Sequence, residues 1–333
     1  VDVLLFDEPL ANLDPATGKQ AIEIIHDIHK ESNKTIIIIE HRLEDVLHRP
    51  IDRILVMDDG RIIADLNPHK LISSEILTDT GIREPLYITA LKYSGIDINP
   101  ELKPGHIDTL KLNATMINSL KTWYRSVESE KIQPSETIIL EIKDVSFSYE
   151  KGKEVLHSAA VKITEGEMLS LVGRNGAGKS TIAKLMCGFE KVDKGIIMYE
   201  GSDIVDKSIK ERAELIGYVM QNPNQMLSQP MIFDEVALGL KLRDVPQEEI
   251  DKRVKKALEI CGLAPFIKWP ISALSYGQKK RVTIAAILVL DPKIIILDEP
   301  TAGQDYKHYT EIMEFLRKIN NLGVTVLLIT HDM

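Results

Sequence analysis

The feature that most constrains this chain is a glycine-rich loop between an apolar run and a helix-like run. The loop, Gly173-Arg-Asn-Gly-Ala-Gly-Lys-Ser-Thr181, fits the pattern in which a glycine and four further residues precede Gly-Lys-Ser/Thr. Met168–Val172 before it is typical of a buried strand, and Ser180–Gly188 after it of a helix closed by glycine. This order gathers backbone N–H groups and the positive end of a helix dipole around one point. It therefore predicts an anion site, and the strand and helix on either side disfavour a chance glycine-rich turn.

The composition of the loop indicates that the anion is a phosphate. Gly173, Gly176 and Gly178 let the backbone approach phosphate oxygens and take positive φ. Lys179 is placed to reach the β- and γ-phosphates of a nucleotide, and the Ser180 hydroxyl to bind Mg²⁺. We therefore expect these residues to bind the nucleotide: Gly173, Arg174, Asn175, Gly176, Ala177, Gly178, Lys179, Ser180 and Thr181.

A long internal repeat is the second feature. The run Val3-Leu-Leu-Phe-Asp-Glu-Pro9 returns as Ile294-Ile-Ile-Leu-Asp-Glu-Pro300, and both copies continue through a helix to a β-branched strand that ends at histidine. The paired positions are Asp7 and Asp298, Glu8 and Glu299, Asp14 and Asp305, and His41 and His331. Three pairs lie 291 positions apart and the histidines 290. This register indicates a duplicated domain.

The repeated side chains suit phosphoanhydride hydrolysis, which needs a metal, a positioned water and a group near the γ-phosphate. Asp298, at the end of an apolar strand, is placed to hold Mg²⁺ through a coordinated water, and Glu299 to act as general base. His331 is placed to hydrogen-bond the γ-phosphate and the catalytic carboxylate. The first copy repeats the set as Asp7, Glu8 and His41. A bare Asp-Glu pair is usually a solvated strand end, and a lone histidine is usually structural. Their repetition, with one copy downstream of a phosphate loop, favours catalysis.

Composition argues against several other classes of protein. A formal net charge of −9 and a pI of about 5.6 disfavour a broad nucleic-acid-binding surface. Two cysteines, Cys187 and Cys261, cannot form a disulfide framework and indicate a reducing compartment. No apolar run approaches the roughly 18–20 residues that span a bilayer. His26 and His29 share a helix face but lack a third metal ligand, so a solvated face is the better interpretation.

We expect three parts along the chain. Residues 1–67 form the C-terminal part of a first domain and include a hairpin at Asp59-Gly60. Residues 68–137 form a helical tail and connector, and residues 138–333 a second domain. Short helices are expected over Leu71–Leu77, Leu86–Tyr93 and Thr109–Val127, with Trp123 and Tyr124 packed in a small core. Alternating strands and helices in the second domain predict an α/β fold with a mostly parallel central sheet.

Three motifs in order, Gly173–Thr181, Leu274-Ser-Tyr-Gly-Gln278 and Asp298-Glu299, resemble an ABC-type ATPase domain. This P-loop fold adds an antiparallel β subdomain and a helical subdomain to the parallel sheet, and here a partial first copy would precede a nearly complete second copy. The resemblance implies ATP as the nucleotide and Mg²⁺ as the metal. It also implies a signature motif that approaches the γ-phosphate bound by the opposite domain, formed by Leu274, Ser275, Tyr276, Gly277 and Gln278.

The resemblance assigns roles to single residues as well. The Ser275 hydroxyl and Gly277 N–H are the expected donors, and Tyr276 departs from the commoner glycine. Gln221 matches the loop that joins Mg²⁺ and water to the membrane partner, and Tyr149 the aromatic ring that stacks on adenine. The positions that match the loop between the two ATP sites are Asp14 and Asp305.

More narrowly, Leu274–Arg281, the stretch from Gln225 to Asp234, and Glu40–Asp45 resemble energy-coupling-factor vitamin importers, above all their hydroxymethylpyrimidine or thiamine double ATPase. Gly81–Pro85 is similar to the tail of such ATPases. The resemblance implies a peripheral protein on the cytoplasmic face of the membrane, with an integral coupling subunit and a substrate-binding membrane subunit as partners. In that family two domains pair head to tail. We expect the chain to be a fragment truncated at both ends that assembles neither complete ATP site by itself.

Three alternatives to the vitamin importer can be compared with this sequence. A soluble tandem ATPase acting on ribosomes or nucleic acid would generally carry a long, charged, helical linker, whereas this connector is broken by Pro100 and Pro104. A sugar-importer tandem tends to have a degraded second phosphate loop, and this loop is intact. A structural role with inactive sites conflicts with the intact second-copy residues.

Overall fold

The computed structural model describes residues 2–331 except for 12, 33, 128–134 and 302–305. The candidate residue Asp305 lies outside the described residues. The chain divides into two compact units, one of residues 1–132 with 303–309 and the other of residues 133–302 with 310–333. Among the described helices, none combines the length and apolar character needed to cross a bilayer.

The first unit begins with a strand–helix–strand segment. Strands β1 (Val3–Asp7) and β2 (Thr35–Ile39) are parallel, and helix α1 (Pro15–Ser32) connects them. The isoleucine run of β2 favours an extended strand because β-branched side chains pack well on a pleated surface. Pro15 suits the first helical turn, where its missing N–H costs nothing. Leu10, Ile22 and Ile25 form a small core here with Val46 of α2 (Leu43–Val46).

A hairpin follows, as predicted. Strand β3 (Ile54–Asp58) pairs antiparallel with β4 (Arg61–Leu66) around a two-residue turn. Both turn residues have positive φ, +44° at Asp59 and +72° at Gly60. Two-residue hairpins favour this left-handed backbone because it matches the twist of the strands.

Four further helices lie in the first unit, and they confirm one predicted helix and correct another. They are α3 (Pro68–Ile72), α4 (Ile76–Asp79), α5 (Leu86–Tyr93) and α6 (Ala114–Ser126), with 3₁₀ turns at Pro100–Leu102 and Ile107–Thr109. Leu86–Tyr93 is confirmed. The single helix expected over Leu71–Leu77 is wrong, because the Ser73 and Ser74 hydroxyls bond to the carbonyls of His69 and Leu71 and the helix stops.

The last of these helices starts later than expected, and one of its aromatic residues is misassigned. Helix α6 begins after Asn113, whose side chain accepts the Met116 N–H as N-cap. Tyr124 is 77% exposed, so its predicted core position is wrong. Trp123 is half-buried and lies against the Tyr93 ring, with the ring centroids 6.0 Å apart.

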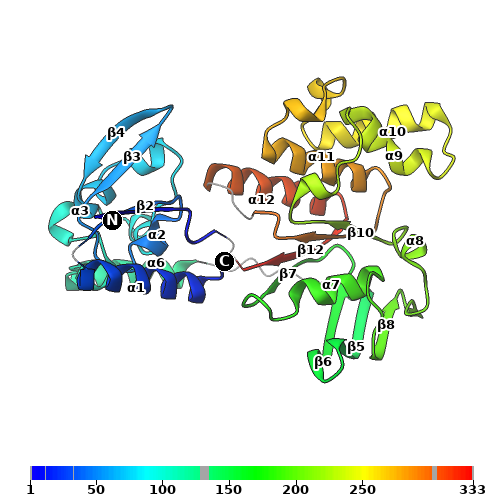
Figure 1. The fold of residues 1–333 in the computed structure, drawn as a ribbon, viewed down its shortest axis with the longest axis horizontal. Helices are drawn as coiled ribbons and strands as arrows, with labels where there is room; N and C mark the ends of the chain where they lie inside the picture. Colours follow the sequence, from blue (N-terminus) through cyan, green and yellow to red (C-terminus); the bar gives the residue numbers. More distant parts are fainter. Residues whose placement is uncertain (1, 12, 33, 128–134, 302–305, 332–333) are drawn as a thin grey trace. The chain divides into compact units, whose positions relative to one another are not determined.

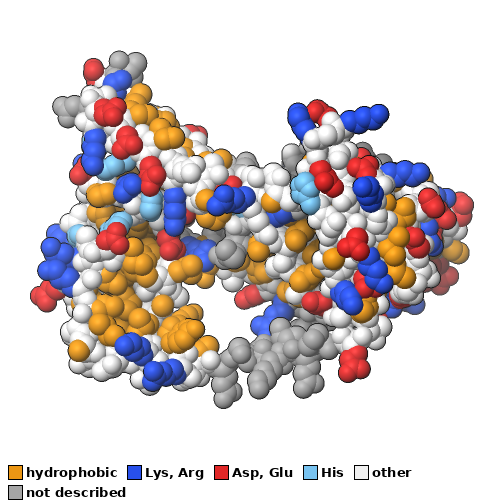
Figure 2. All heavy atoms as spheres, turned by 90° about the horizontal axis from the view of Figure 1, so that it is seen from below, with side chains coloured by type: hydrophobic (Ala, Val, Ile, Leu, Met, Phe, Trp, Pro, Cys, Tyr) orange, Lys and Arg blue, Asp and Glu red, His pale blue; other side chains and the backbone are white. Residues whose placement is uncertain are grey.

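The predicted connector packs with the hairpin. A shared core joins Val56 and Ala64 of the hairpin to Leu71, Ile88 and further residues of the helices. Hydrophobic side chains also gather on the exposed surface of this unit (Figure 2). The exposed large hydrophobic side chains of this unit include Leu5 of β1, Ile37 of β2 and Met57 of β3.

The second unit is built on the predicted parallel sheet (Figure 1). Its strand order is β10-β11-β12-β7, and neighbouring strands are parallel. The strands are β7 (Met168–Val172), β10 (Ile216–Val219), β11 (Ile294–Asp298) and β12 (Thr325–Thr330). All five residues of β11 are buried, as its unbroken apolar sequence requires.

Alternate residues of β11 enter two different cores. Ile294 and Ile296 pack with α7 (Lys179–Cys187) and an antiparallel sheet, whereas Ile295 and Leu297 pack with the helices on the other face. The antiparallel sheet has the order β6-β5-β8-β9, formed by β5 (Ile138–Glu150), β6 (Lys153–Thr164), β8 (Lys194–Tyr199) and β9 (Ser202–Asp203). Each isoleucine buried in this way stabilises the fold by about 1.5–3 kcal/mol.

The opposite face carries a helical layer. Its helices are α9 (Ile232–Lys241), α10 (Gln247–Ile260), α11 (Tyr276–Leu288) and, from residue 310 onward, α12 (Tyr306–Asn321). The smaller elements of this unit are α8 (Ile209–Arg212) and 3₁₀ turns at Pro223–Gln225, Ala264–Phe266 and Ile271–Ala273. Cys261, which follows α10, is 1% exposed and packs in the core of this layer.

Candidate active site

The glycine loop lies at the carboxyl end of β7 and leads into α7. Gly176 and Gly178 have φ of +79° and +88°, and Gly178 is the N-cap of the helix. A Cβ added at Gly178 would lie 2.8 Å from Leu156 Cδ2, so this position requires glycine both for its backbone and for its space. The structure therefore forms the predicted cradle in front of a helix N-terminus.

The cationic side chain of the loop turns back over it. Lys179 Nζ donates to the carbonyl oxygens of Gly173 and Arg174, at 2.7 and 3.2 Å. The first-turn N–H groups of α7 have no acceptor within the helix. Ammonium and N–H donors are thus gathered at one end of α7, which suits a multiply charged phosphate.

The structure brings Ser180 and Asp298 together, as predicted for two residues at one metal. The Ser180 hydroxyl donates to Asp298 Oδ1 at 3.1 Å, although the two residues are 118 positions apart. The Tyr218 hydroxyl at the end of β10 donates to Asp298 Oδ2 at 2.8 Å. Burial, with Asp298 as a second cause, raises the pKa of Tyr218, which therefore remains a donor. Sequence reasoning missed Tyr218, because only the sheet order places β10 beside β11.

Glu299 adopts a strained backbone directly after β11. Its φ is +47°, and its N–H donates to the Ile329 carbonyl at 2.8 Å. Glu299 Oε1 lies 2.8 Å from His331 Nδ1, and both residues are less than a tenth exposed. Glu299 Oε2 is buried and has no hydrogen-bond partner among the described residues. An acceptor in that condition is suited to a water or ligand proton.

In the first copy the backbone is the same, but the glutamate and histidine side chains lie farther apart. Glu8 has a φ of +43°, and its N–H donates to the Ile39 carbonyl at 2.9 Å. His41 Nδ1 lies 3.9 Å from Glu8 Oε1, and the Glu8 side chain is 54% exposed. The Glu8–His41 pair is therefore looser than its counterpart, and Asp7 beside it is exposed.

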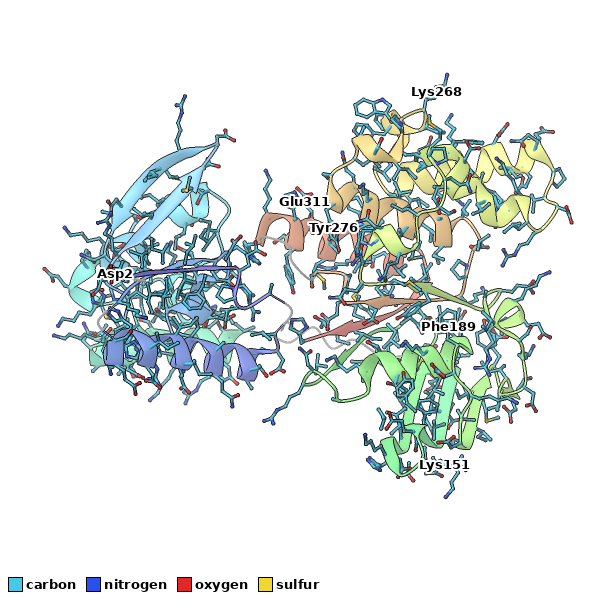
Figure 3. All side chains as sticks on the ribbon, viewed as in Figure 1. Asp2, Lys151, Phe189, Lys268, Tyr276 and Glu311 are labelled. Carbon is cyan, nitrogen blue, oxygen red and sulfur yellow. The ribbon has the colours of Figure 1, made fainter. Side chains whose placement is uncertain are left out.

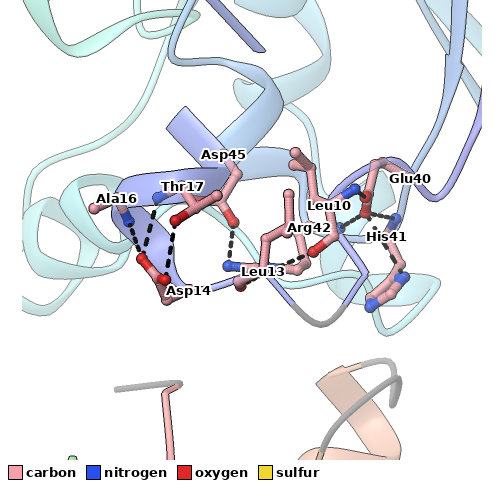
Figure 4. A network of polar contacts seen from close by, with 9 residues as sticks. All are labelled: Leu10, Leu13, Asp14, Ala16, Thr17, Glu40, His41, Arg42 and Asp45. Carbon is pink, nitrogen blue, oxygen red and sulfur yellow. Dashed lines mark hydrogen bonds and ion pairs between the residues drawn. The ribbon is translucent and has the colours of Figure 1, made fainter. Parts of the chain in front are cut away.

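Near this pair, Asp14 and Glu40 stabilise backbone groups (Figure 4). Asp14 Oδ1 accepts the N–H groups of Ala16 and Thr17, each at 3.1 Å, and caps α1. Glu40 accepts the Leu10 N–H at 3.0 Å and the His41 N–H at 3.1 Å. Asp14 is 4% exposed, so a helix cap is the role that its contacts give it.

The signature residues form the start of α11. Ser275 Oγ accepts the Gln278 N–H at 3.3 Å, and Gln278 Oε1 accepts the Ser275 N–H at 3.0 Å, which is a capping box. The Ser275 hydroxyl proton is not used by this cap, and the Gly277 N–H falls in the first turn, where helices leave donors unpaired. Leu274 is 6% exposed and anchors the motif in the core. The Tyr276 hydroxyl donates to the Gln221 carbonyl at 3.3 Å, which brings these two predicted residues together.

Tyr149 lies beside the phosphate loop. Its hydroxyl is 3.4 Å from Thr181 Oγ1, and Lys184 Nζ lies 5.9 Å from its ring centroid. Phe147 holds the ring edge-on at 4.8 Å between centroids. Tyr149 remains 51% exposed, which leaves ring surface for a flat partner.

His26 and His29 on α1 have no third metal ligand beside them among the described residues. His29 Nδ1 lies 2.8 Å from the Lys34 carbonyl. Burial and then Lys30 lower the pKa of His26. Within the described part of the chain, no group of three or more His, Cys, Asp or Glu side chains is arranged to hold a metal.

A parallel sheet that presents a phosphate loop, a buried aspartate and a buried glutamate at its carboxyl edge defines a P-loop nucleotide-binding domain. Two family descriptions match this chain: "ABC transporter" over residues 156–302 and "ATP-binding cassette cobalt transporter" over residues 74–147. The solved structure of cbiO1 from Clostridium perfringens, part of the ABC transporter complex cbiONQ, is 38% identical with a TM-score of 0.56. The match covers 59% of this chain and 80% of that chain. The chain therefore belongs to the ATP-binding proteins of ABC transporters.

Other relatives agree. A Clostridium perfringens protein named as an ABC transporter ATP-binding protein is 60% identical over the whole chain, and one from Enterococcus faecalis is 56% identical over 99% of it. The chain spans 58% of the length of each. The ADP conformation of MJ1267, an ATP-binding cassette of an ABC transporter, is 26% identical with a TM-score of 0.54, and the match covers 59% of this chain and 82% of that one.

Proposed function

We propose that the protein containing this chain hydrolyses ATP in the second unit and couples hydrolysis to transport across a membrane. One observation carries the proposal: Glu299 is buried, one of its carboxylate oxygens contacts His331, and the other has no hydrogen-bond partner among the described residues. Such a carboxylate, one residue after an aspartate that contacts the phosphate-loop serine, suits a general base for an attacking water.

The residues present fit Mg²⁺. Oxygen donors are what this ion prefers, and the Ser180–Asp298 contact collects them beside the cradle. Ser180, Asp298 and Gln221 would hold the ion, with Asp7 as the first-copy counterpart of Asp298. When bound, Mg²⁺ neutralises charge that develops on the phosphates.

The chain's own residues then have separate tasks. The loop N–H groups and Lys179 bind and orient the triphosphate, and Tyr149 stacks on the adenine ring. Glu299 Oε2 takes the proton of the attacking water, while His331 fixes the carboxylate through Oε1. Tyr218 orients Asp298 by donating to its other carboxylate oxygen.

The proposal includes a duplicated, head-to-tail arrangement. The duplication is supported by the backbone that the two copies share. In each copy, the glutamate has positive φ and its N–H bonds to the carbonyl at the end of the next strand. Glu8 and His41 would serve a first site, the signature Leu274–Gln278 would face it, and Asp14 and Asp305 would lie between sites.

We further propose an energy-coupling-factor importer with two membrane subunits, one for coupling and one for substrate binding, the ATPase being peripheral on the cytoplasmic face. No nucleic-acid partner is included, and neither the family nor the relatives support the ribosome-associated alternative. A vitamin of the hydroxymethylpyrimidine or thiamine type remains our prediction from the motifs. Cobalt is a second candidate, favoured by the "ATP-binding cassette cobalt transporter" match over residues 74–147.

Hydrolysis is tested with the full-length protein. The E8Q/E299Q double variant should lose about 10²-fold or more in ATPase rate and still bind ATP, because general-base catalysis contributes on that order. E259Q, which changes an exposed carboxylate on α10, is the matched control. A double variant with the wild-type rate contradicts the assigned base.

Transport is tested by co-purification from native cells in mild detergent, followed by mass spectrometry. Small polytopic membrane proteins should be recovered. In a separate uptake assay, cells lacking the gene should lose uptake of either labelled vitamin or labelled Co²⁺. Recovery of ribosomes without membrane proteins would overturn the importer.

A further inference from the structure

A buried lysine lies directly behind the catalytic strand ends. Lys280, on the second turn of α11, is 1% exposed. Its Nζ donates to the Gln221 carbonyl at 2.7 Å and to the Glu299 carbonyl at 3.2 Å. No carboxylate oxygen of the described residues lies within ion-pair distance of this ammonium. The cation is therefore held by two backbone carbonyls, and each belongs to a residue assigned to the ATP site.

Such a group is unfavourable to bury for packing alone. Removing an ammonium from water costs several kcal/mol unless hydrogen bonds replace the lost hydration. A leucine or methionine would fill the same space without that cost, so the position of the charge itself calls for a role.

A second side chain of α11 reaches the same carbonyl. The Tyr276 hydroxyl donates to the Gln221 carbonyl at 3.3 Å, so this oxygen accepts from both Tyr276 and Lys280. Tyr276, labelled in Figure 3, is the first residue of α11 and lies one helical turn before Lys280. This contact gives a physical reason for an aromatic residue where the signature motif more commonly has glycine.

The two carbonyls lie at neighbouring strand ends. Gln221 follows β10, Glu299 follows β11, and these strands pair directly, with Val219 opposite Leu297. Three elements therefore meet at one ammonium: the helix that begins with the signature motif, the segment at Gln221, and the backbone of the general base.

We propose that Lys280 and Tyr276 form a clamp through which the position of α11 sets the position of Gln221 and of Glu299. Lys280 is a positioning residue, since its ammonium bonds to the backbone carbonyls of Gln221 and Glu299 and acts through these two residues. A displacement of α11 pulls on the Glu299 carbonyl, and the strained backbone of Glu299 passes that shift to its carboxylate. Placement of the signature helix thus controls hydrolysis in the same domain. The inference rests on the proposed ATPase function of this site.

The test uses the full-length protein carrying E8Q, so that hydrolysis reports on Glu299. K280M should lower kcat about 10-fold or more while the KM for ATP stays within about 2-fold, because small misplacements of a catalytic group cost rate rather than binding. K280R, which keeps the charge and its donors, should recover part of the lost kcat. K279M is the matched control, since among the described residues the Lys279 ammonium hydrogen-bonds only to the Asn224 side chain, at 3.5 Å, and this variant should keep the parent kcat.

Y276F guards against a folding defect in K280M, because it leaves the buried charge in place. Loss of its one hydrogen bond should lower kcat about 2–10-fold with unchanged KM and melting temperature. Parent kcat in both K280M and Y276F would overturn the clamp, as would a loss that follows only the melting temperature. An E8Q parent no more active than E8Q/E299Q would instead overturn the proposed function, and the clamp with it.

Discussion

The two left-handed glycines of the phosphate loop should respond differently to the same substitution. Gly176 and Gly178 both have φ near +80 to +90°, so alanine at either position loses about 1–2 kcal/mol to the backbone conformation. An added Cβ at Gly176 meets no atom within 4 Å, whereas at Gly178 it lies 2.8 Å from Leu156 Cδ2 and 3.4 Å from the Val155 carbonyl. Overpacking of this kind costs a further ~1–3 kcal/mol. G178A should therefore be the more destabilising variant by that amount.

The assay is thermal unfolding of the full-length protein, with G176A as the matched control. For a domain of about 150–250 residues each kcal/mol shifts the melting temperature by about 2–4 °C, so G178A should melt roughly 2–12 °C below G176A. L156A should lower the melting temperature less in the G178A background than in the wild type, because it removes the atom that clashes, although Leu156 is itself a core residue. Equal melting temperatures for the two single variants would refute the steric argument and leave only the backbone term.

Three further outcomes follow from the contacts of the second unit. R212M should lower the melting temperature by roughly 6–20 °C (about 3–5 kcal/mol), because the buried Arg212 donates to four backbone carbonyls that would lose this donor; an unchanged melting curve would contradict this. S275A should cost about 0.5–2 kcal/mol through loss of the N-cap of α11, which thermal unfolding also measures. Cys187 and Cys261 should resist iodoacetamide at pH 8 in the folded protein and react in urea, since burial raises the pKa of each thiol to about 12; mass spectrometry of the labelled protein decides the point, and rapid native labelling would contradict it.

Local sequence predicted those elements whose pattern leaves little choice. The strand Met168–Val172 has the predicted bounds, and the helix after the phosphate loop ends at the predicted glycine, Gly188, which has a φ of +77°. The apolar run Ile294–Leu297 predicted a strand, and all five residues of β11 are buried. In each case turn residues bound the element, and its hydrophobic pattern fits one structure.

The errors and omissions concern residues whose environment depends on contacts with parts of the chain that are distant in the sequence. Tyr124 carries a large aromatic ring but lies on the exposed side of α6, and no local pattern marks that side. Tyr218 belongs to no motif, and Lys280 lies in the Leu274–Arg281 stretch but received no role of its own from the sequence. Each becomes part of the site only because the sheet order sets β10 beside β11 and α11 packs behind both. A search for polar side chains at the ends of the predicted strands would have found Tyr218.

Glu8 and Glu299 show which features of the site the repeated motif determines and which features depend on the surrounding fold. Both glutamates take the same left-handed backbone and the same bond to the neighbouring strand, so the local sequence is sufficient for that geometry. Their side chains differ, with 10% exposure and 2.8 Å to histidine at Glu299 against 54% and 3.9 Å at Glu8. Strand β11 has a paired strand on each side and Lys280 behind its end, whereas among the described residues β1 pairs with β2 alone. A short histidine–carboxylate contact is favoured when water is excluded from both groups, since the effective dielectric constant falls. The acid–base chemistry of the motif is therefore set by the strands and the helix packed around it.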